Sequence, residues 1–331
     1  MPRSDGHDTR LLTVILNWRT PEMTLRATES ALHAMRTIQG GIVIVDNDSG
    51  DGSEALLREA VAARGWAPRV RVVQSGRNGG FGAGNNAGIR AGLAEGRAAD
   101  FVYVLNSDAF PDEHAITALL AHMQAHPEAG LAGSRLEGAD GAPHVSAFRF
   151  PSLLSEIEGP LRFGPVSRLM SRHSVWMRMP EQSGPVDWVA GASLMMRAGM
   201  LDATGGFDEG FFLYFEETDL CRRARTAGFE THFVRESHVQ HIGSVSTGMG
   251  SWARVPDYWY DSRRLYFRRH FGAAGGFAAT GLHLLSGGLH RLRCLAMRRE
   301  TGDPPGFLRG MIRHELGHVS GSRAVSTRTR A

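Results

Sequence analysis

The side chains best suited to chemistry are carboxylates in two segments that lie about 110 residues apart. The first segment, LNSDAFP at residues 105–111, follows the apolar run FVYVL. That run predicts a strand, so Asp108 should lie just beyond its carboxyl end, where ligands bind in open α/β sheets. A carboxylate in this position can hold a divalent metal ion.

The second segment, FFLYFEETDLC at residues 211–221, leads into a predicted helix from Glu217 to about Ala227, which Gly228 ends. A carboxylate at the start of a helix can act as a general base. We expect the helix dipole to keep Glu217 ionised at neutral pH while weakening its basicity. Together, the two segments indicate transfer chemistry on a diphosphate-linked substrate.

A structural explanation for the second acidic segment is also open. Glu216, Glu217 and Asp219 could complement the helix dipole and pair with Arg222 or Arg223 at helical spacing. This explanation is favoured for Asp219 and disfavoured for Glu217.

Strand and helix patterns alternate along the first part of the chain. Short β-branched runs predict strands, and longer amphipathic stretches predict helices. Strands are expected at residues 11–16, 41–45, 69–74 and 100–105, and helices at 21–35, 53–63, 85–95 and 114–126. This alternation predicts an α/β fold with a mostly parallel sheet flanked by helices, whose first hundred residues bind a nucleotide.

The rest of the chain is less regular. Residues 135–185 are expected to form a loop-rich or helical insertion that shapes an acceptor pocket. Further strands are predicted at Trp188–Arg197 and Thr231–Val234. The expected organisation is a disordered segment at 1–9, one large domain at 10–270 and a helical tail at 271–331.

Composition restricts the class of protein. The 331 residues are 42% hydrophobic and 21% charged, as in ordinary globular proteins, and the basic residues are all arginine. These arginines form no platform interleaved with aromatics, so no nucleic-acid partner is expected. Cys221 and Cys294 form no CxxC pair, and the first residues lack the apolar core of a signal peptide. We therefore expect a reducing, cytoplasmic setting.

The C-terminal segment has an amphipathic pattern. Its apolar residues fall on one face at helical spacing: Leu282, Leu285, Leu289, Leu292 and Ala296. Arginines occupy the other faces. This pattern favours contact of residues 271–331 with a membrane surface or in a homodimer over plain packing, and six glycines make residues 271–290 unsuited to cross a membrane.

The string VDNDSGDGS at residues 45–53 lies between the second predicted strand and the next helix. Asp46 can accept hydrogen bonds from a base or a ribose hydroxyl, whereas Asp51 or Ser53 can cap the helix. Capping alone would explain most of these polar residues. The complete string is more specific than its parts.

Six strings in order resemble family 2 inverting glycosyltransferases of the GT-A fold, and within them the bacterial rhamnosyltransferase-like branch. They are VDNDSGDGS, RNGGFGAGNNAGI, NSDAFP, VAGASLMMR, GGFDEGFFLYFEETDLCRR and HIGSVS. The resemblance covers about residues 10–250. It implies transfer of a sugar from a nucleoside diphosphate donor to an acceptor hydroxyl, with Mg²⁺ or Mn²⁺ holding the diphosphate.

By position, the resemblance implies that Asp46 contacts the nucleotide base, Asp108 binds the metal and Glu217 is the catalytic base. His241, 24 residues after Glu217, corresponds to a further metal ligand. Asn106 replaces the first acidic residue of the family's Asp-x-Asp element, so it should contact ribose or a water rather than the metal. The base position more often carries Asp, which makes Glu216 a rival candidate.

The expected contacts form two sets. Donor contacts are expected from Asn17, Asp46, Asn78, Asn85, Asn106 and Asp108. Acceptor contacts are expected from Trp188, Glu216 and Asp219. The resemblance implies dTDP-L-rhamnose as donor, with UDP-sugars as alternatives, and a glycan or polyprenyl-diphosphate-linked acceptor of cell-envelope polysaccharide synthesis. The enzyme would work in the cytoplasm or peripherally on the inner face of the membrane.

Two formal motif matches indicate other classes. Residues 82–87 fit the dinucleotide fingerprint GxGxxA, but two βα units precede them, whereas that fingerprint follows the first strand. Their glycines should instead allow close approach of the donor, with Asn85 capping the helix. HELGH at residues 314–318 fits the zinc-protease signature, but only 13 residues follow it. We expect the polar side of a terminal amphipathic helix there.

Two rival functions are disfavoured. A nucleotidyltransferase would carry a glycine-rich loop with Arg or Lys after the first strand, and residues 17–21 read NWRTP. A non-catalytic module that binds sugar or lipid needs neither Asp108 nor Glu217.

Overall fold

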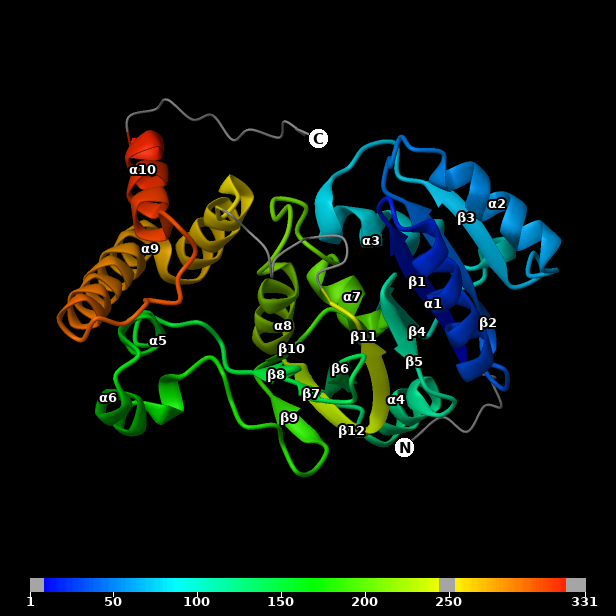
Figure 1. Ribbon diagram of the computed structural model, residues 1–331. Coiled ribbons are helices and arrows are strands. Elements are labelled where there is room, and N and C mark those ends of the chain that lie inside the picture. Colours follow the sequence, from blue (N-terminus) through cyan, green and yellow to red (C-terminus); the bar gives the residue numbers. More distant parts are fainter. Residues whose placement is uncertain (1–8, 244–253, 320–331) are drawn as a thin grey trace. The chain divides into compact units, whose positions relative to one another are not determined.

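The computed structural model describes residues 9–243 and 254–319 (Figure 1). The expected disordered segment, apart from Thr9, the last three residues of HIGSVS and the end of the tail lie outside these ranges. The chain divides into two compact units. Unit 1 comprises residues 1–148, 178–209 and 216–247, and unit 2 comprises residues 149–177, 210–215 and 248–331.

The first elements of unit 1 alternate between strand and helix, as expected. They are β1 (Arg10–Asn17), α1 (Pro21–Ala34), β2 (Gln39–Asp46), α2 (Ser53–Ala63), β3 (Val70–Gln74), α3 (Gly80–Ala91), the short 3₁₀ helix η1 (Ala94–Gly96) and β4 (Phe101–Asn106). Most β-branched and leucine side chains of β1 and β2 are buried, and the main core includes Leu11, Ile15, Ile42 and Ile44. Because both faces of these strands are buried, their sequences are continuously apolar and do not alternate with polar residues.

The second part of unit 1 completes the sheet. Its elements are β5 (Ala109–Pro111), α4 (Ala115–Ala125), β6 (Ala129–Glu137), β7 (Pro143–His144), β8 (Ala147–Phe148), β9 (Gly184–Val186), β10 (Trp188–Val189), β11 (Ser193–Arg197), α7 (Ala198–Thr204), α8 (Glu216–Thr226) and β12 (Glu230–His241). The main strand order is β3-β2-β1-β4-β11-β6-β12-β5.

The sheet is mostly parallel. Strands β3, β2, β1 and β4 run parallel to one another, as do β6 and β12, whereas β11 runs antiparallel to its neighbours β4 and β6. The expected α/β class is therefore confirmed. The carboxyl ends of β1, β2 and β4 meet at one edge of the sheet, where ligands bind in such folds.

The helix expected at residues 85–95 instead begins at Gly80 and ends at Ala91. Its glycines form the face that packs on the sheet: a Cβ at Gly84 would lie 2.4 Å from Leu16 Cδ1, and one at Gly88 would lie 2.4 Å from Val14 Cγ1. Because glycines and not apolar side chains form the packed face, apolar residues do not recur at helical spacing in this part of the sequence. Asn85 is consequently inside the helix and is not its cap.

The strand expected at Trp188–Arg197 is two strands in two different sheets. β10 pairs with β8, placing Trp188 opposite Phe148, whereas β11 pairs with β4 and β6. Residues 190–192, Ala-Gly-Ala, connect them. Small side chains let the backbone turn from one sheet to the other, which a run of apolar residues does not reveal.

Unit 2 is helical. It contains α5 (Ser155–Leu161), α6 (Gly164–Leu169), the 3₁₀ helix η2 (Ser171–His173), α9 (Asp257–Ala296) and α10 (Phe307–Val319). Helix α9 is kinked at Gly272, where φ is 73°, close to the expected boundary at residue 270. The domain boundaries stay a prediction. A buried ion pair between Arg263 and Glu156 joins α9 to α5.

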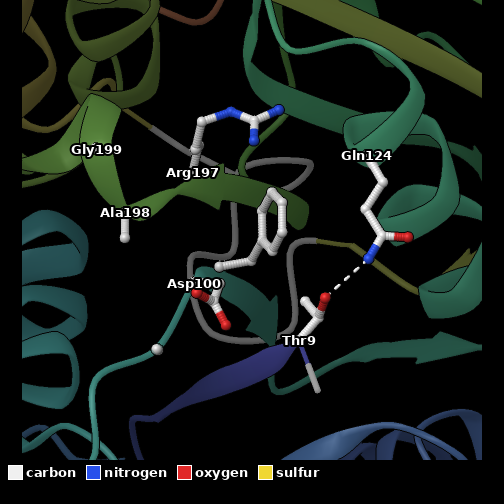
Figure 2. A pocket seen from close by; sticks show the side chains of 8 residues that line it. Thr9, Asp100, Gln124, Arg197, Ala198 and Gly199 are labelled. Atoms are coloured by element: carbon white, nitrogen blue, oxygen red, sulfur yellow. Dashed lines mark hydrogen bonds between the residues drawn. The ribbon is translucent and has the colours of Figure 1, made fainter. Parts of the chain in front are cut away.

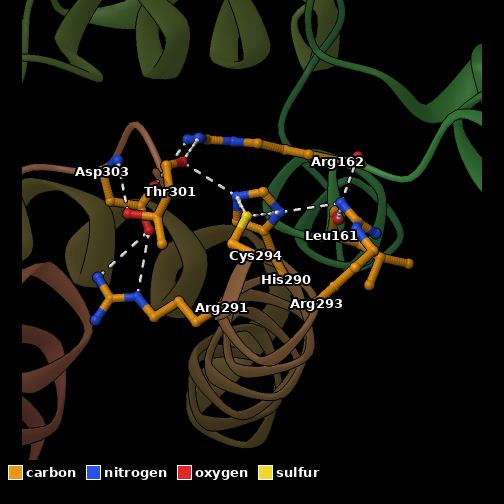
Figure 3. A network of polar contacts seen from close by, with 8 residues as sticks. All are labelled: Leu161, Arg162, His290, Arg291, Arg293, Cys294, Thr301 and Asp303. Carbon is orange, nitrogen blue, oxygen red and sulfur yellow. Dashed lines mark hydrogen bonds and ion pairs between the residues drawn. The ribbon is translucent and has the colours of Figure 1, made fainter. Parts of the chain in front are cut away.

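The leucine face of α9 is exposed within unit 2. Leu285, Leu289, Leu292 and Leu295 are each at least half exposed. Two of the arginines near this face are engaged internally: Arg293 donates to the carbonyl oxygens of residues 161 and 162, and Arg291 bonds Asp303 (Figure 3). Among the described helices, none combines the length and apolar character needed to cross a membrane.

Candidate active site

Asn17 and Asp46 end the paired strands β1 and β2 and lie directly opposite each other. The Asp46 carboxylate is 1% exposed and accepts hydrogen bonds from Asn17 Nδ2 (2.7 Å), Ser49 Oγ (2.6 Å) and Gln74 Nε2 (3.0 Å). The Ser49 N–H also donates to it. These contacts order the loop after β2. The expected contact of Asp46 with a nucleotide base stays a prediction.

Asn47 is a buried polar residue that the sequence analysis did not select. Its Nδ2 donates to Asn78 Oδ1 (3.0 Å), which also accepts the Gly80 N–H. Its Oδ1 is buried and has no hydrogen-bond partner in the described part of the chain. Asn47 belongs to the string VDNDSGDGS, but nothing in that string distinguished it from a turn residue.

Two adjacent asparagines in α3 have different surroundings. Asn85 is fully buried and donates to the Phe81 carbonyl, and its Oδ1 has no hydrogen-bond partner among the described residues. Asn86 donates to the Phe207 carbonyl (2.8 Å) and accepts the Phe207 N–H (3.1 Å). Asn86 therefore fixes the loop after α7. The unmet oxygen leaves Asn85 able to accept one more bond.

The two expected metal ligands lie together at the end of β4. Asp108 follows β4, and pairing of β5 with β12 places His241 opposite Ala109. His241 Nε2 is 3.3 Å from Asp108 Oδ1, and the Asn106 amide is 3.5 Å from the same nitrogen. His144, which the sequence analysis did not select, has its ring centre 6.5 Å from that of His241.

The residues at this edge fit a divalent cation. Two ligands of one ion at bond lengths of about 2.1 Å lie roughly 3 to 4 Å apart at common coordination angles. The Asp108–His241 separation of 3.3 Å falls in that range. Both side chains are largely buried, at 7% and 18% exposure, so the pair is held in place by packing. A carboxylate with an imidazole suits Mn²⁺ better than an all-oxygen site does.

Glu216 and Glu217 begin α8, and each has a buried Oε2 without a hydrogen-bond partner among the described residues. Burial raises the pKa of Glu216 well above its usual range, and the adjacent Glu217 raises it further. Burial also raises the pKa of Glu217, although the N–H groups of Glu217, Gly191 and Thr218 oppose the shift. The N–H groups at the helix start lower the pKa of Glu217, as expected, but burial outweighs them, so the net shift is upward and not downward.

A short path of contacts connects Glu217 to the end of β4. The Asn106 N–H donates to the Ala192 carbonyl at 3.0 Å. The preceding residue, Gly191, donates its N–H to Glu217, and a Cβ at Gly191 would lie 3.7 Å from Glu217 Oε1. Glu217 and the last residue of β4 are therefore both anchored to residues 191–192, which lead into β11.

The remaining expected acceptor residues have structural partners. Asp219 is fully buried and forms an ion pair with Arg223 at 2.7 Å, which favours the structural explanation for this residue. Trp188 is stacked on Phe148, with ring centres 4.2 Å apart and planes at 14°. The acceptor roles of both stay predictions.

A pocket of about 470 Å³ lies at the other end of the strands (Figure 2). Thr9 precedes β1 and Asp100 precedes β4, so this pocket is at the amino ends. Its arginine, Arg197, is bonded to the carbonyl oxygens of Met123, His126 and Ala129. Ligands of open α/β sheets bind at the opposite edge. The pocket is therefore a poor candidate for the active site.

The fold matches solved sugar-transfer enzymes. GalNAc-T7, solved with UDP, GalNAc and Mn²⁺, aligns with 94% of this chain and 55% of its own at a TM-score of 0.54 and 13% identity. The mannosyltransferase PcManGT from Pyrobaculum calidifontis, solved with GDP-Man and Mn²⁺, aligns with 96% and 82% at a TM-score of 0.55 and 12% identity. The fold is that of GT-A glycosyltransferases.

The chain belongs to glycosyltransferase family 2, because the model described as "Glycosyltransferase like family 2" matches residues 9–267. It is 32% identical over 217 residues to an N-acetylglucosaminyl-diphospho-decaprenol L-rhamnosyltransferase of Mycobacterium tuberculosis, covering 62% of this chain and 68% of that protein. It is 41% identical over 56 residues to rhamnosyltransferase WbbL of Escherichia coli K12, covering 17% and 21%. The expected family and rhamnosyltransferase-like branch are confirmed.

Proposed function

We propose that this glycosyltransferase moves L-rhamnose from dTDP-L-rhamnose to a hydroxyl of a polyprenyl-diphosphate-linked glycan in cell-envelope synthesis, with inversion at the anomeric carbon. The observation that carries the proposal is the contact of Asp108 with His241 at the end of β4, with Glu217 anchored to the neighbouring segment through Gly191. Similarity to two rhamnosyltransferases supports the choice of sugar.

Asp108 and His241 would hold a divalent cation, Mn²⁺ or Mg²⁺, at this edge of the sheet. Such an ion stabilises the negative charge of the departing nucleoside diphosphate. Asn106, within 3.5 Å of the His241 ring, keeps that ring oriented toward Asp108. The neutral Asn106 adds no charge to the pair.

Glu217 would remove the proton of the acceptor hydroxyl as that oxygen attacks. Burial and the adjacent Glu217 raise the pKa of Glu216 well above its usual range. Glu217 has three N–H donors that stabilise its ionised form. These donors favour Glu217 over Glu216 as the base.

The donor-binding residues would lie along the ends of β1, β2 and β4. Asn17 and Asn78 hold their neighbours by hydrogen bonds, whereas Asn85 and Asn47 each retain a buried oxygen able to accept a bond. Helix α3 begins at Gly80, whose N–H donates to Asn78 next to Asn47. Close approach of a nucleotide diphosphate to such a helix start is favourable.

The acceptor would be presented from a lipid surface. The stacked rings of Trp188 and Phe148 offer an apolar plane for a sugar. In unit 2, the exposed leucines of α9 offer a face suited to peripheral contact with a membrane or to a homodimer. The name of the Mycobacterium tuberculosis relative, which includes a diphospho-decaprenol, supports a lipid-linked acceptor.

The proposal is tested by a transfer assay with the full chain, Mn²⁺ and a synthetic polyprenyl-diphosphate N-acetylglucosamine. The donors are dTDP-L-rhamnose, UDP-glucose, UDP-galactose and UDP-N-acetylglucosamine, and the anomeric configuration of the product is read by NMR. We expect turnover with dTDP-L-rhamnose and inversion. Turnover with a UDP-sugar alone would contradict the choice of donor, and retention would contradict the mechanism.

A further inference from the structure

The terminal helix of the described chain carries two histidines that share one carboxylate. His314 and His318 lie one turn apart on α10. His314 Nε2 is 2.7 Å and His318 Nε2 is 3.3 Å from the same atom, Asp261 Oδ1, on α9. All three residues belong to unit 2. The sequence analysis recognised HELGH but not its partner, since Asp261 lies about 50 residues before it.

The three ligand atoms have the spacing of a transition-metal site. They all lie within 4.8 Å of one another. Ligands of a tetrahedral Zn²⁺ with bonds of about 2.1 Å are roughly 3.4 Å apart, so little movement separates the observed arrangement from a coordinated one. Two imidazoles with one carboxylate is a donor set that Zn²⁺ accepts in proteins, with a fourth position left for water.

Packing fixes the two histidines before any ion binds. His314 is 3% exposed and lies against Tyr260, with ring centres 5.6 Å apart. The Tyr260 hydroxyl donates to the Phe307 carbonyl, and Gly310 lets α10 approach closely, since a Cβ there would lie 2.5 Å from that hydroxyl. Asp261 is 50% exposed. The cluster is therefore both ordered and open to solvent.

Glu315, the acidic residue of HELGH, is engaged elsewhere. Its carboxylate contacts Arg264 (3.3 Å) and the Thr280 hydroxyl (3.3 Å), both on α9. In zinc proteases this residue serves as the general base. Here it ties α10 to α9, which indicates a role for the histidine pair in holding the two helices and not in hydrolysis.

A second cluster in unit 1, Glu128, Glu230 and His232, is less suited to an ion. Both ring nitrogens of His232 already have partners: Nε2 is 2.9 Å from Glu230, and Nδ1 is 2.8 Å from His122 Nε2. A metal would have to replace a bond within that histidine group. At Asp261, a metal ion would replace only the protons in the hydrogen bonds between the two imidazoles and the carboxylate.

We propose that Asp261, His314 and His318 form a binding site for Zn²⁺ or a similar divalent transition metal, which fastens α10 to α9. The site is separate from the Asp108–His241 pair and does not depend on the proposed transfer reaction.

The test is a Zn²⁺ titration by calorimetry on the full chain after treatment with a chelator, with bound metal counted by elemental analysis. The variants are His318→Gln and Asp261→Asn. Asp257→Asn, which removes the same charge one turn earlier on α9, is the matched control. Asp108→Asn identifies any ion held at the other pair. Far-ultraviolet circular dichroism checks that each variant is folded.

We expect the wild type, Asp257→Asn and Asp108→Asn to bind Zn²⁺ at this site. His318→Gln and Asp261→Asn should bind it at least about 100-fold more weakly, because loss of a direct ligand exceeds the 10- to 100-fold effect of outer contacts. Equal affinity in these variants and the wild type would overturn the proposal. Co²⁺ added to the wild type tests the site without any variant, through the visible absorption spectrum of the bound ion. Absence of the absorption typical of four-coordinate Co²⁺ would also overturn the proposal.

Discussion

Each compact unit brings histidine and carboxylate together, but through different backbone. In unit 1, Asp108 lies in the turn just before β5 and meets His241 of β12 through the antiparallel pairing of these strands. In unit 2, His314 and His318 share one helical turn and meet Asp261 on the adjacent helix. The first pair depends on the register of a whole sheet, whereas the second needs only one helix contact. The unit 1 pair is therefore set by long-range strand pairing, and the unit 2 cluster by a single helix contact.

Glycines also serve different purposes in the two units. In α3 they allow close contact with β1, and Gly88 would meet Val14 and Val45 if it carried a Cβ. In α9, a Cβ at Gly281 would meet nothing within 4 Å. Gly88 is thus required for packing, whereas Gly281 is not.

The largest effect is expected from Glu217→Gln, which sharpens the assignment of the chemistry to unit 1. Transfer should fall by about 10²- to 10⁴-fold, the usual contribution of a general base, while donor binding is retained. Glu216→Gln should cost less, and the exposed Glu59→Gln should act as the wild type. Single-turnover rates with a lipid-linked acceptor measure this. A larger loss in Glu216→Gln than in Glu217→Gln would make Glu216 the base.

Glycine substitutions compare the two units directly. Gly88→Ala should destabilise the protein by about 1 to 3 kcal/mol, because Val14 is stiff and fully buried. Gly281→Ala should stabilise it by about 0.5 to 1 kcal/mol through helix propensity. Equilibrium denaturation with urea measures both. Equal changes in the free energy of unfolding for the two substitutions would show that Gly88 and Gly281 do not differ in their need for close packing.

The pH dependence of stability tests the burial of Glu216. Its pKa is raised in the folded state, so the folded chain binds more protons than the unfolded chain between the two pKa values. The stabilisation of the folded state by protonated Glu216 is fully present below the ordinary glutamate pKa of about 4.5. This stabilisation is lost as the pH rises toward the raised pKa of the folded state. Glu216→Gln should therefore raise the Tm at neutral pH, with less gain in acid. A gain independent of pH would contradict this.

The smallest effect on stability is expected from Leu289→Ser on the exposed face of α9. Surface substitutions usually change stability by less than about 0.5 kcal/mol. Binding to vesicles of anionic lipid, measured by co-sedimentation, should nevertheless weaken, because the apolar face inserts at the membrane interface. Leu56→Ser, at an exposed leucine of α2, is the control. Unchanged vesicle binding would leave a homodimer as the use of this face.

The sequence predicted β1 to β4 and the first four helices, since buried β-branched runs and amphipathic helices have clear periods. It did not predict β5 to β9, and it merged β10 with β11. It missed the start of α3, because a face of glycines carries no hydrophobic period. It selected Asp108 from its position after a strand as well as by resemblance, and His241 by resemblance alone. Their contact, however, depends on a strand pairing that spacing does not encode.

Other features of the site follow only from packing. The raised pKa of Glu217 results from burial, which the position of that residue at a helix start did not indicate. The unmet oxygen of Asn47 also depends on its buried surroundings. In unit 2, HELGH was visible, but the partner Asp261 required the fold of α9 against α10.

The central claim is that Asp108 and His241 hold the cation that binds the donor diphosphate. The most direct test is calorimetric titration of dTDP-L-rhamnose into the wild type, Asp108→Ala and His241→Ala, with Mn²⁺ and with EDTA. Asp202→Ala, an exposed residue of α7, is the control. The account predicts tight binding by the wild type and control with Mn²⁺ only, and weak binding by the other two variants. Binding of equal strength in EDTA, or in Asp108→Ala, would contradict it.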